Sequence, residues 1–511
     1  MKKLLCFSLA TLLILSLFAA CGEKKEAKLA DVTFDSFAVG YGKADITPDP
    51  ATQVMIQGNN DHVQRLSTGI QEALWANCIA FTDADGTTVL LFGTDLPESN
   101  RDNIARIRTE LEEKTGVPAD HIQINCSHSH SAPCQGYSAI PAVKKSDDNI
   151  VAKCVEAGIA ALESRKPAKM YTSFARPEGL NFVRHYILKN GLHTGEGLGA
   201  IADWDILGHM EAADNLMQLV KFTREGEKDI VLINWQAHPS SPLHDEYYTC
   251  FSSQNVGVMR RVLLEKADVE SLYILGGAGD VGTESHIAEE IRYASYKDHG
   301  TALADVAMEA FADFREAETG SIQFRSQKFD IDGRGYELSA FGFGDFAFVG
   351  MPWEAFQTNA MAVKEQSPYY MTFYGALTND TYGYLPDAFS WTYEMYESSA
   401  TFVPQGSAEI VEKELLSMLS DCFNESGQTQ KEKADGYVMD HTPKWNGYTY
   451  KVTAQSEAIP AKSRHYQVTL DLNGSMNTLV VEDQALAEEI LRQTTVKLLF
   501  NSRNVAVAID K

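Results

Sequence analysis

Short apolar segments that run directly into clusters of His, Ser, Asp or Gly most constrain the fold of this 511-residue chain. These segments are His121–Cys126, Ile230–Trp235, Leu272–Leu275 and Ala347–Gly350. Helical segments alternate with strands along the chain. The clearest is Asn100–Gly116, just before the first of these segments, because its apolar residues recur every three or four positions and it stops on glycine. This alternation predicts an α/β fold in which helices flank a mixed β-sheet core.

Tight turns predict two antiparallel strand pairs within this core. Asp85-Gly86 separates the strands Ala73–Thr82 and Thr87–Thr94, which is a strong hairpin signal. A second hairpin is expected between Leu216–Phe222 and the strand that ends at Trp235. A further helix is predicted at Asp148–Glu163.

The composition changes toward the C-terminus, where residues 424–436 are polar and predict a linker. After it, three strand-like segments and a helix at Asp483–Arg492 predict a small C-terminal α+β domain of unknown role. The expected organisation is a signal peptide at 1–21, a tether at 22–37, a large domain at 38–423, the linker at 424–436 and the small domain at 437–511.

The first 21 residues predict export. Two lysines precede the apolar stretch Leu4–Phe18, and Ala19-Ala20 then leads into Cys21. This pattern resembles a bacterial lipobox, which implies lipidation of Cys21 after cleavage. The expected location is the bacterial cell surface, with membrane contact through the lipid anchor only. Simple secretion and an uncleaved anchor are the alternatives.

Charge and cysteine content exclude several classes of protein. The net charge of −26, from 44 basic and 70 acidic residues, argues against nucleic-acid binding and against docking onto anionic lipid. Six cysteines follow Cys21 without a Cys-x-x-Cys pair, so a disulfide framework or a structural zinc site is not expected. A bridge between Cys126 and Cys134 and buried free thiols both remain open.

Four residues are candidates for chemistry, and each also has an ordinary structural explanation. His128 and His130 follow a strand end at alternate positions, so both imidazoles can face one cleft. His238 follows another strand, within Ala-His-Pro. Glu354 lies where a strand is predicted to turn into a helix, so it is also explained as a helix N-terminal cap. The histidines are also explained as ordinary hydrogen-bonded residues.

Motifs of other enzyme classes are weak or absent. Gly277–Gly282 matches Gly-x-Gly-x-x-Gly, but the residues after it begin a helix poorly, so a dinucleotide site is not favoured. Gly-x-Ser-x-Gly and His-Glu-x-x-His do not occur, which removes the usual support for an α/β-hydrolase or a thermolysin-like protease.

Taken in order, the motifs resemble those of the neutral (non-lysosomal) ceramidase family. The resemblance covers about residues 38–410. The motifs are Val39–Pro48, Ser127–Pro133, Ala237–Ser241, Gly279-Asp280, Gly350–Glu354, and Tyr384 followed by Tyr396-Glu-Ser-Ser. This family hydrolyses the amide bond of N-acylsphingosine and carries a zinc ion in its catalytic domain, so the resemblance implies a zinc hydrolase domain at 38–423.

The resemblance also implies roles for individual residues. The zinc ligands would be His128, His238, Glu354 and Tyr384. His130 would act as the proton shuttle, while Tyr396 and Arg184 would bind the amide oxygen or its developing charge. Substrate contacts would come from Arg184, Gly279, Asp280 and Gly282. Asp95, at a strand end, would be a hydrogen-bond partner of a zinc-bound histidine.

One position departs from the family pattern. The family carries a serine in Gly-Asp-x-Ser-Pro, whereas this chain has Gly282, which has no hydroxyl group. Thr283 or Ser285 would replace that serine only in a reshaped loop. The simpler hypothesis is direct attack by a zinc-activated water, which requires no serine.

The sequence therefore predicts a zinc-dependent amidohydrolase that cleaves ceramide or a related N-acyl lipid. A zinc hydrolase acting on a different amide or ester is one alternative, since the missing serine weakens the substrate assignment. A non-catalytic solute-binding lipoprotein is the other, and its histidines would hold no tightly bound metal. The oligomeric state stays open.

Overall fold

The computed structural model describes residues 28–57, 65–188, 193–195, 205–239, 249–287, 293, 295–437, 442–461, 465–503 and 505–510. The predicted signal peptide, Cys21 and the first part of the tether lie outside these residues. Within the described residues, no helix combines the length and apolar character needed to cross a bilayer.

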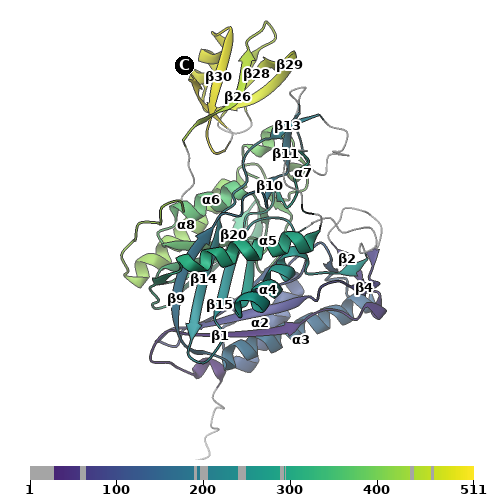
Figure 1. Cartoon of the computed structure of the whole chain (residues 1–511), viewed down its shortest axis with the longest axis vertical. Helices are drawn as coiled ribbons and strands as arrows, with labels where there is room; N and C mark the ends of the chain where they lie inside the picture. The colour runs from purple at the N-terminus through teal and green to yellow at the C-terminus, as the bar shows by residue number, and fades with distance from the viewer. Residues whose placement is uncertain are drawn as a thin grey trace, which may run out of the picture.

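The large domain is built on a nine-stranded mixed sheet (Figure 1). Its strand order is β17-β15-β14-β9-β1-β5-β6-β7, with β19 added at β9. These strands are β1 (Ala38–Asp45), β5 (Trp75–Thr82), β6 (Thr88–Thr94), β7 (Ile122–Cys126), β9 (Lys166–Ala175), β14 (Met217–Arg224), β15 (Ile230–Trp235), β17 (Glu270–Leu275) and β19 (Arg315–Ala317). The pairs β6–β7 and β15–β17 are parallel and the other pairs are antiparallel, which confirms the mixed sheet.

A second sheet lies face to face with the first. Its strands, in order, are β20 (Gln323–Ile331), β21 (Arg334–Phe343), β22 (Phe346–Gly350) and β24 (Met371–Gly375). Aromatic side chains fill the space between the sheets, and the ring centroids of Phe81 and Phe343 lie 5.2 Å apart across it. Burial of these rings on both inner faces holds the two sheets together.

Helices cover the outer face of each sheet, so the domain has four layers in the order α, β, β, α. The large sheet packs against α2 (Arg101–Thr115), α3 (Pro141–Glu163), α4 (Gln254–Ala267) and α5 (Tyr296–Glu309). The smaller sheet packs against α6 (Gln357–Gln366) and α8 (Ser407–Ser426). This arrangement confirms the predicted α/β fold with a sheet core flanked by helices.

Local signals explain where several elements begin and end. Asn100 caps α2 by accepting the Asn103 N–H, and Gly116 ends it at φ 84°. α3 begins at Pro141, before the predicted start at 148, because proline is preorganised for the first helical turn. The expected helix start at Glu354 is wrong, since Glu354 lies in the short strand β23 (Glu354–Ala355) and Phe356 is the N-cap of α6.

Short strand pairs lie outside the two sheets. They are β2 (Met55–Gln57) with β3 (Arg65–Leu66) and β8 (Ala132–Pro133); β4 (Gly69–Ile70) with β16 (Cys250–Phe251); β10 (Phe182–Val183) with β18 (Val281–Gly282); β11 (His185–Leu188) with β12 (His193–Gly195) and β13 (Ile206–His209); and β23 with β25 (Tyr384–Leu385). The short helix α7 (Tyr396–Ser399) follows β25.

Residues 444–510 form a separate six-stranded sheet with its own apolar core, drawn in yellow at one end of the molecule in Figure 1. Its elements are β26 (Lys444–Lys451), β27 (Glu457–Pro460), β28 (Tyr466–Leu472), β29 (Ser475–Val481), α9 (Gln484–Leu491), β30 (Thr495–Phe500) and β31 (Ala506–Asp510). The segment predicted as a linker, 424–436, overlaps the end of α8, which continues to Ser426. Just after that segment, Tyr437 is buried against the large domain.

The six cysteines in the described residues are buried free thiols. Cys126 and Cys134 therefore form no bridge.

Candidate active site

Two histidine loops meet beside the ends of β7 and β15. His128 follows β7 and adopts φ 63°, a backbone conformation that is uncommon for a residue other than glycine and is often found at functional sites. Its Nε2 lies 3.1 Å from Nε2 of His130, so the two imidazoles do face one point, as the alternate spacing predicted. His238 follows β15, and its ring centroid lies 4.7 Å from that of His128.

Glu354 brings a carboxylate to the same point. Its Oε2 lies 3.2 Å from His128 Nε2 and 3.0 Å from His238 Nε2. The strand pairing β23–β25 places Glu354 directly opposite Tyr384, so both predicted ligands come from one small ladder. The Tyr384 ring stacks near His238 at a centroid distance of 6.5 Å. The four residues predicted to hold zinc therefore lie together.

The hydrogen bonds of the two histidines show that this cluster fits a cation. His128 Nδ1 contacts the Pro97 carbonyl, and His238 Nδ1 lies 2.6 Å from the Ala278 carbonyl. A carbonyl only accepts, so each Nδ1 carries the proton and each Nε2 presents a lone pair to the Glu354 carboxylate. Three acceptor atoms that face one another require a positive charge between them, and such N/O donors suit zinc.

His130 also belongs to the cluster by distance. One ring nitrogen from each of His128, His130 and His238 lies within 4.8 Å of the others, a spacing at which all three could hold one ion. Two arrangements are therefore compatible with the geometry: His130 as a ligand, or His130 as a neighbouring proton carrier.

The charged groups of the cluster shift one another's pKa values. Burial raises the pKa of Glu354, but His128 and His238 lower it more, so its pKa lies well below the usual value. Burial lowers the pKa of His128, yet Glu354 and the Pro97 carbonyl together raise it above the usual value. Burial and the two neighbouring histidines lower the pKa of His130 well below its usual value. A proton on His128 thus balances the carboxylate when no cation is bound.

Tyr384 is held by an arginine. Arg184 donates to Tyr384 Oη at 3.1 Å and to the Gly279 carbonyl at 2.7 Å, and both residues are buried. Burial, followed by the Glu354 carboxylate, raises the pKa of Tyr384 well above its usual value. Ionisation of this phenol therefore needs additional positive charge, which a divalent cation would supply. Tyr396 completes this side, with its ring 5.7 Å from that of Tyr384.

Glu397 is a site residue that the sequence analysis did not identify. Its carboxylate is fully buried and accepts from Arg184 Nε at 2.8 Å, while its second oxygen lies 2.9 Å from His185 Nε2. The signal was present in the motif Tyr396-Glu-Ser-Ser, but an acidic residue in a short helix does not reveal its burial.

The loop after β17 supports the site through its backbone. Gly279 passes so close to Glu354 that a Cβ atom there would lie 2.4 Å from the Glu354 carbonyl oxygen. Asp280 is fully buried, and its carboxylate accepts the Gln357 N–H at 2.9 Å at the start of α6. Burial raises the pKa of Asp280 to about 7. Both residues thus position the loop beside Glu354.

Gly282 lies directly beside the histidine cluster, bridged to His238 by backbone pairing. A Cβ atom at Gly282 would meet no atom of the described residues within 4 Å, so these residues leave room for a side chain there. Ser285 does not take over there, because its hydroxyl lies 3.0 Å from His209 Nε2 in a separate pair.

The predicted role of Asp95 as a partner of a histidine is wrong. Its carboxylate binds Arg260 and accepts the Trp75 N–H at 2.8 Å. His128 instead donates its Nδ1 hydrogen bond to the carbonyl of Pro97, two residues after Asp95. A carboxylate at a strand end was the expected partner, but a backbone carbonyl fixes the same tautomer without a second buried charge.

Comparison with known proteins identifies the fold. No family model matches the chain, and no curated protein matches it in sequence. A ceramidase solved in complex with C2 matches with a TM-score of 0.63 and 13% identity, covering 88% of this chain and 90% of that one. The neutral ceramidase from Pseudomonas aeruginosa matches with a TM-score of 0.61 and 14% identity, covering 86% and 84%. The chain therefore has the fold of the neutral ceramidases, as its motifs predicted.

Proposed function

We propose that this protein is a zinc-dependent amidohydrolase of the neutral ceramidase type, which cleaves the N-acyl amide of N-acylsphingosine or a related N-acyl lipid. The observation that carries the proposal is the convergence of His128 Nε2 and His238 Nε2 on one atom, Glu354 Oε2, at 3.2 and 3.0 Å. These residues come from three separate parts of the chain.

In this proposal His128, His238 and Glu354 hold the metal, with Tyr384 as a fourth ligand on the side of Arg184. A zinc ion bound there would polarise the amide carbonyl and lower the pKa of an attacking water to about 7. The Nδ1 hydrogen bonds of the two histidines keep their Nε2 atoms aimed at that point.

The remaining residues orient the substrate and move the proton. His130 Nε2 faces the cluster, where it can accept a proton from the attacking water and return it to the leaving amine. Arg184 and Tyr396 flank Tyr384 and can donate hydrogen bonds to the amide oxygen as negative charge develops on it. Gly282 leaves open space where the family carries a serine, so attack by water is the favoured route.

The substrate class rests on the structural neighbours and on the predicted anchor. One neighbour is a ceramidase in complex with C2, which supports an N-acyl lipid as substrate. We further propose that Cys21 carries a lipid anchor, which would hold the enzyme at the membrane where such substrates reside. Other N-acyl lipids and acylated amino compounds are the next candidates.

The test is hydrolysis by the purified protein, stripped with a chelator and then reloaded with zinc. N-acetylsphingosine, an N-acylethanolamine and an N-acyl amino acid are compared by the release of the amine. We expect zinc-dependent turnover with N-acetylsphingosine preferred, and its loss in Glu354→Gln. Glu394→Gln, which changes an exposed carboxylate, is the matched control. Zinc-loaded protein that cleaves none of the three substrates would contradict the proposed activity.

A further inference from the structure

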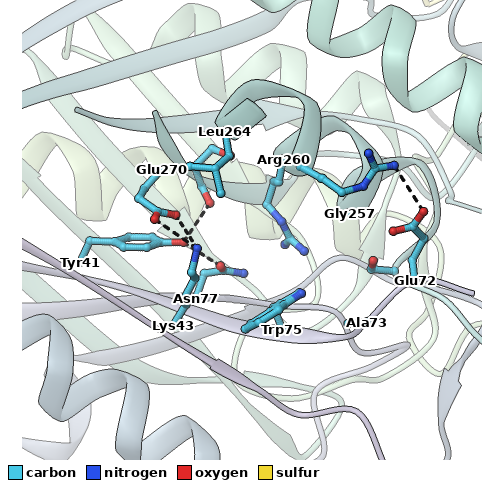
Figure 2. Close-up of a pocket in the computed structure, with 13 residues that line it drawn as sticks. Tyr41, Lys43, Glu72, Ala73, Trp75, Asn77, Gly257, Arg260, Leu264 and Glu270 are labelled. Carbon is cyan, nitrogen blue, oxygen red and sulfur yellow. Dashed lines mark hydrogen bonds and ion pairs between the residues drawn. The ribbon is translucent and has the colours of Figure 1, made fainter. Parts of the chain in front are cut away.

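A cavity lies between α4 and the strands β1, β5 and β17 of the large sheet (Figure 2). Its volume is about 270 Å³, which suits a small molecule. None of the candidate active-site residues lines it.

A buried arginine points into this cavity. Arg260 is 8% exposed, and its guanidinium lies between Asn77 and Trp75 in Figure 2. One terminal nitrogen of Arg260 donates a hydrogen bond to the Asp95 carboxylate. A guanidinium has five N–H groups, so most of its donors have no protein partner in the described part of the chain. Unused donors on a buried arginine call for an acceptor within the cavity.

The charged groups around the cavity are paired with one another. Glu270 binds Lys43 at 2.8 Å (Figure 2), Glu72 binds Arg261 at 3.4 Å, and Asp95 binds Arg260. The amide oxygen of Asn77 accepts from Tyr41 at 2.8 Å. The cavity therefore offers a ligand the N–H groups of Arg260 that Asp95 leaves unused, and no excess of positive charge.

A further feature completes the binding site. The Trp75 ring forms a flat wall, over which Lys43 Nζ lies 5.9 Å from the ring centroid. A flat group stacked on this ring would carry an attached acceptor toward Arg260.

We propose that this cavity binds a small carboxylate that carries a flat apolar group. The carboxylate accepts from the Arg260 guanidinium, and the flat group packs against Trp75. A carboxylate matches the two-pronged donor geometry of arginine, which a neutral amide or an ammonium does not. The site is independent of the proposed hydrolase activity, because its residues do not overlap with the histidine cluster.

The test is isothermal titration of the purified protein with benzoate, phenylacetate and indole-3-acetate, each beside its neutral amide and its amine. We expect at least one carboxylate to bind at one site, with its amide and amine weaker by about tenfold or more. Trp75→Leu removes the flat wall, and Arg260→Lys keeps the charge opposite Asp95 but removes the planar fork. Both variants should weaken binding by about tenfold while their melting curves stay cooperative.

Glu354→Ala distinguishes this cavity from the active site, since binding in the cavity should survive that change. Three results would overturn the proposal: no carboxylate binds at millimolar concentration, the amide and amine bind as well as the acid, or Glu354→Ala abolishes binding while Trp75→Leu and Arg260→Lys leave it intact.

Discussion

Glu397 holds Arg184 by a hydrogen bond of 2.8 Å to Nε, although 213 positions separate the two residues. The same guanidinium donates to Tyr384 Oη, so the position of the phenol depends on Glu397 through Arg184. His185 occupies the second carboxylate oxygen of Glu397. The four side chains form one buried chain of charged hydrogen bonds that ends at the candidate metal site.

Replacing Glu397 by Gln should impair both stability and turnover. Removal of one partner from a buried ion pair leaves an uncompensated charge on Arg184, which costs about 3 kcal/mol or more in the free energy of unfolding. Urea unfolding at pH 7 measures this cost. We expect kcat to fall more than KM rises, because Arg184 is displaced while the metal ligands remain. Glu394→Gln, with an exposed carboxylate, should change neither quantity; a Glu397→Gln protein of parental stability would contradict the buried network.

The contribution of Glu397 should also depend on pH. Burial raises its pKa, but His185 and Arg184 lower it more, to about 2. Because the folded pKa is below the unfolded value of about 4.3, this stabilisation is complete above that value and is lost as the pH falls toward 2. The stability difference between the parent and Glu397→Gln should therefore shrink between pH 5 and pH 3. A difference that stays constant over this range would exclude the ionised carboxylate as its source.

Much of the fold was predictable because local chemistry decides it. The hairpin β5–β6 follows from Asp85-Gly86, and α2 follows from its cap at Asn100 and its stop at Gly116. The strands that precede His128 and His238 were predicted for the same reason, as apolar runs followed by polar residues. The face-to-face packing of two sheets was not predicted, because strand periodicity does not tell which sheet a strand joins.

The sequence predicts a site residue where that residue belongs to a recognisable motif. It does not predict a residue whose role depends on contacts made only in the folded protein. The resemblance led to Glu354, although the pattern around it wrongly favoured a helix start, because the pairing of β23 with β25 depends on distant residues. Asp95 was assigned to the wrong partner, since a strand-end carboxylate does not show which way it points. Glu397 was missed because burial of a charge cannot be seen in a polar segment.

His130→Ala distinguishes its two possible roles. If His130 carries the proton, the variant should keep its zinc while kcat falls by about 10² or more. If His130 is a ligand, zinc should be lost together with activity. Zinc content and kcat measured on the same sample decide between the two roles. A variant that keeps both its zinc and full turnover would rule out both of them.

Gly282→Ser should be accommodated without strain, because a Cβ atom there meets no atom of the described residues within 4 Å. We expect the free energy of unfolding to change by no more than about 0.5 kcal/mol. If water is the attacking group, the added hydroxyl should leave kcat within about threefold of the parent, a difference of less than 1 kcal/mol in the barrier. An increase of about a hundredfold would show instead that the chain lacks a serine that its chemistry needs. Gly282→Ala serves as the control for added volume.

The most direct measurement is the zinc content of the purified protein after chelation, reloading and exhaustive dialysis, beside Glu354→Ala. The proposed site has His128, His238 and Glu354 as ligands, with both histidine Nε2 atoms about 3 Å from Glu354 Oε2. It predicts about one tightly held zinc per chain in the parent and much less in the variant. Absence of zinc from the reloaded parent, or equal zinc in both proteins, would contradict the metal site on which the proposed hydrolysis depends.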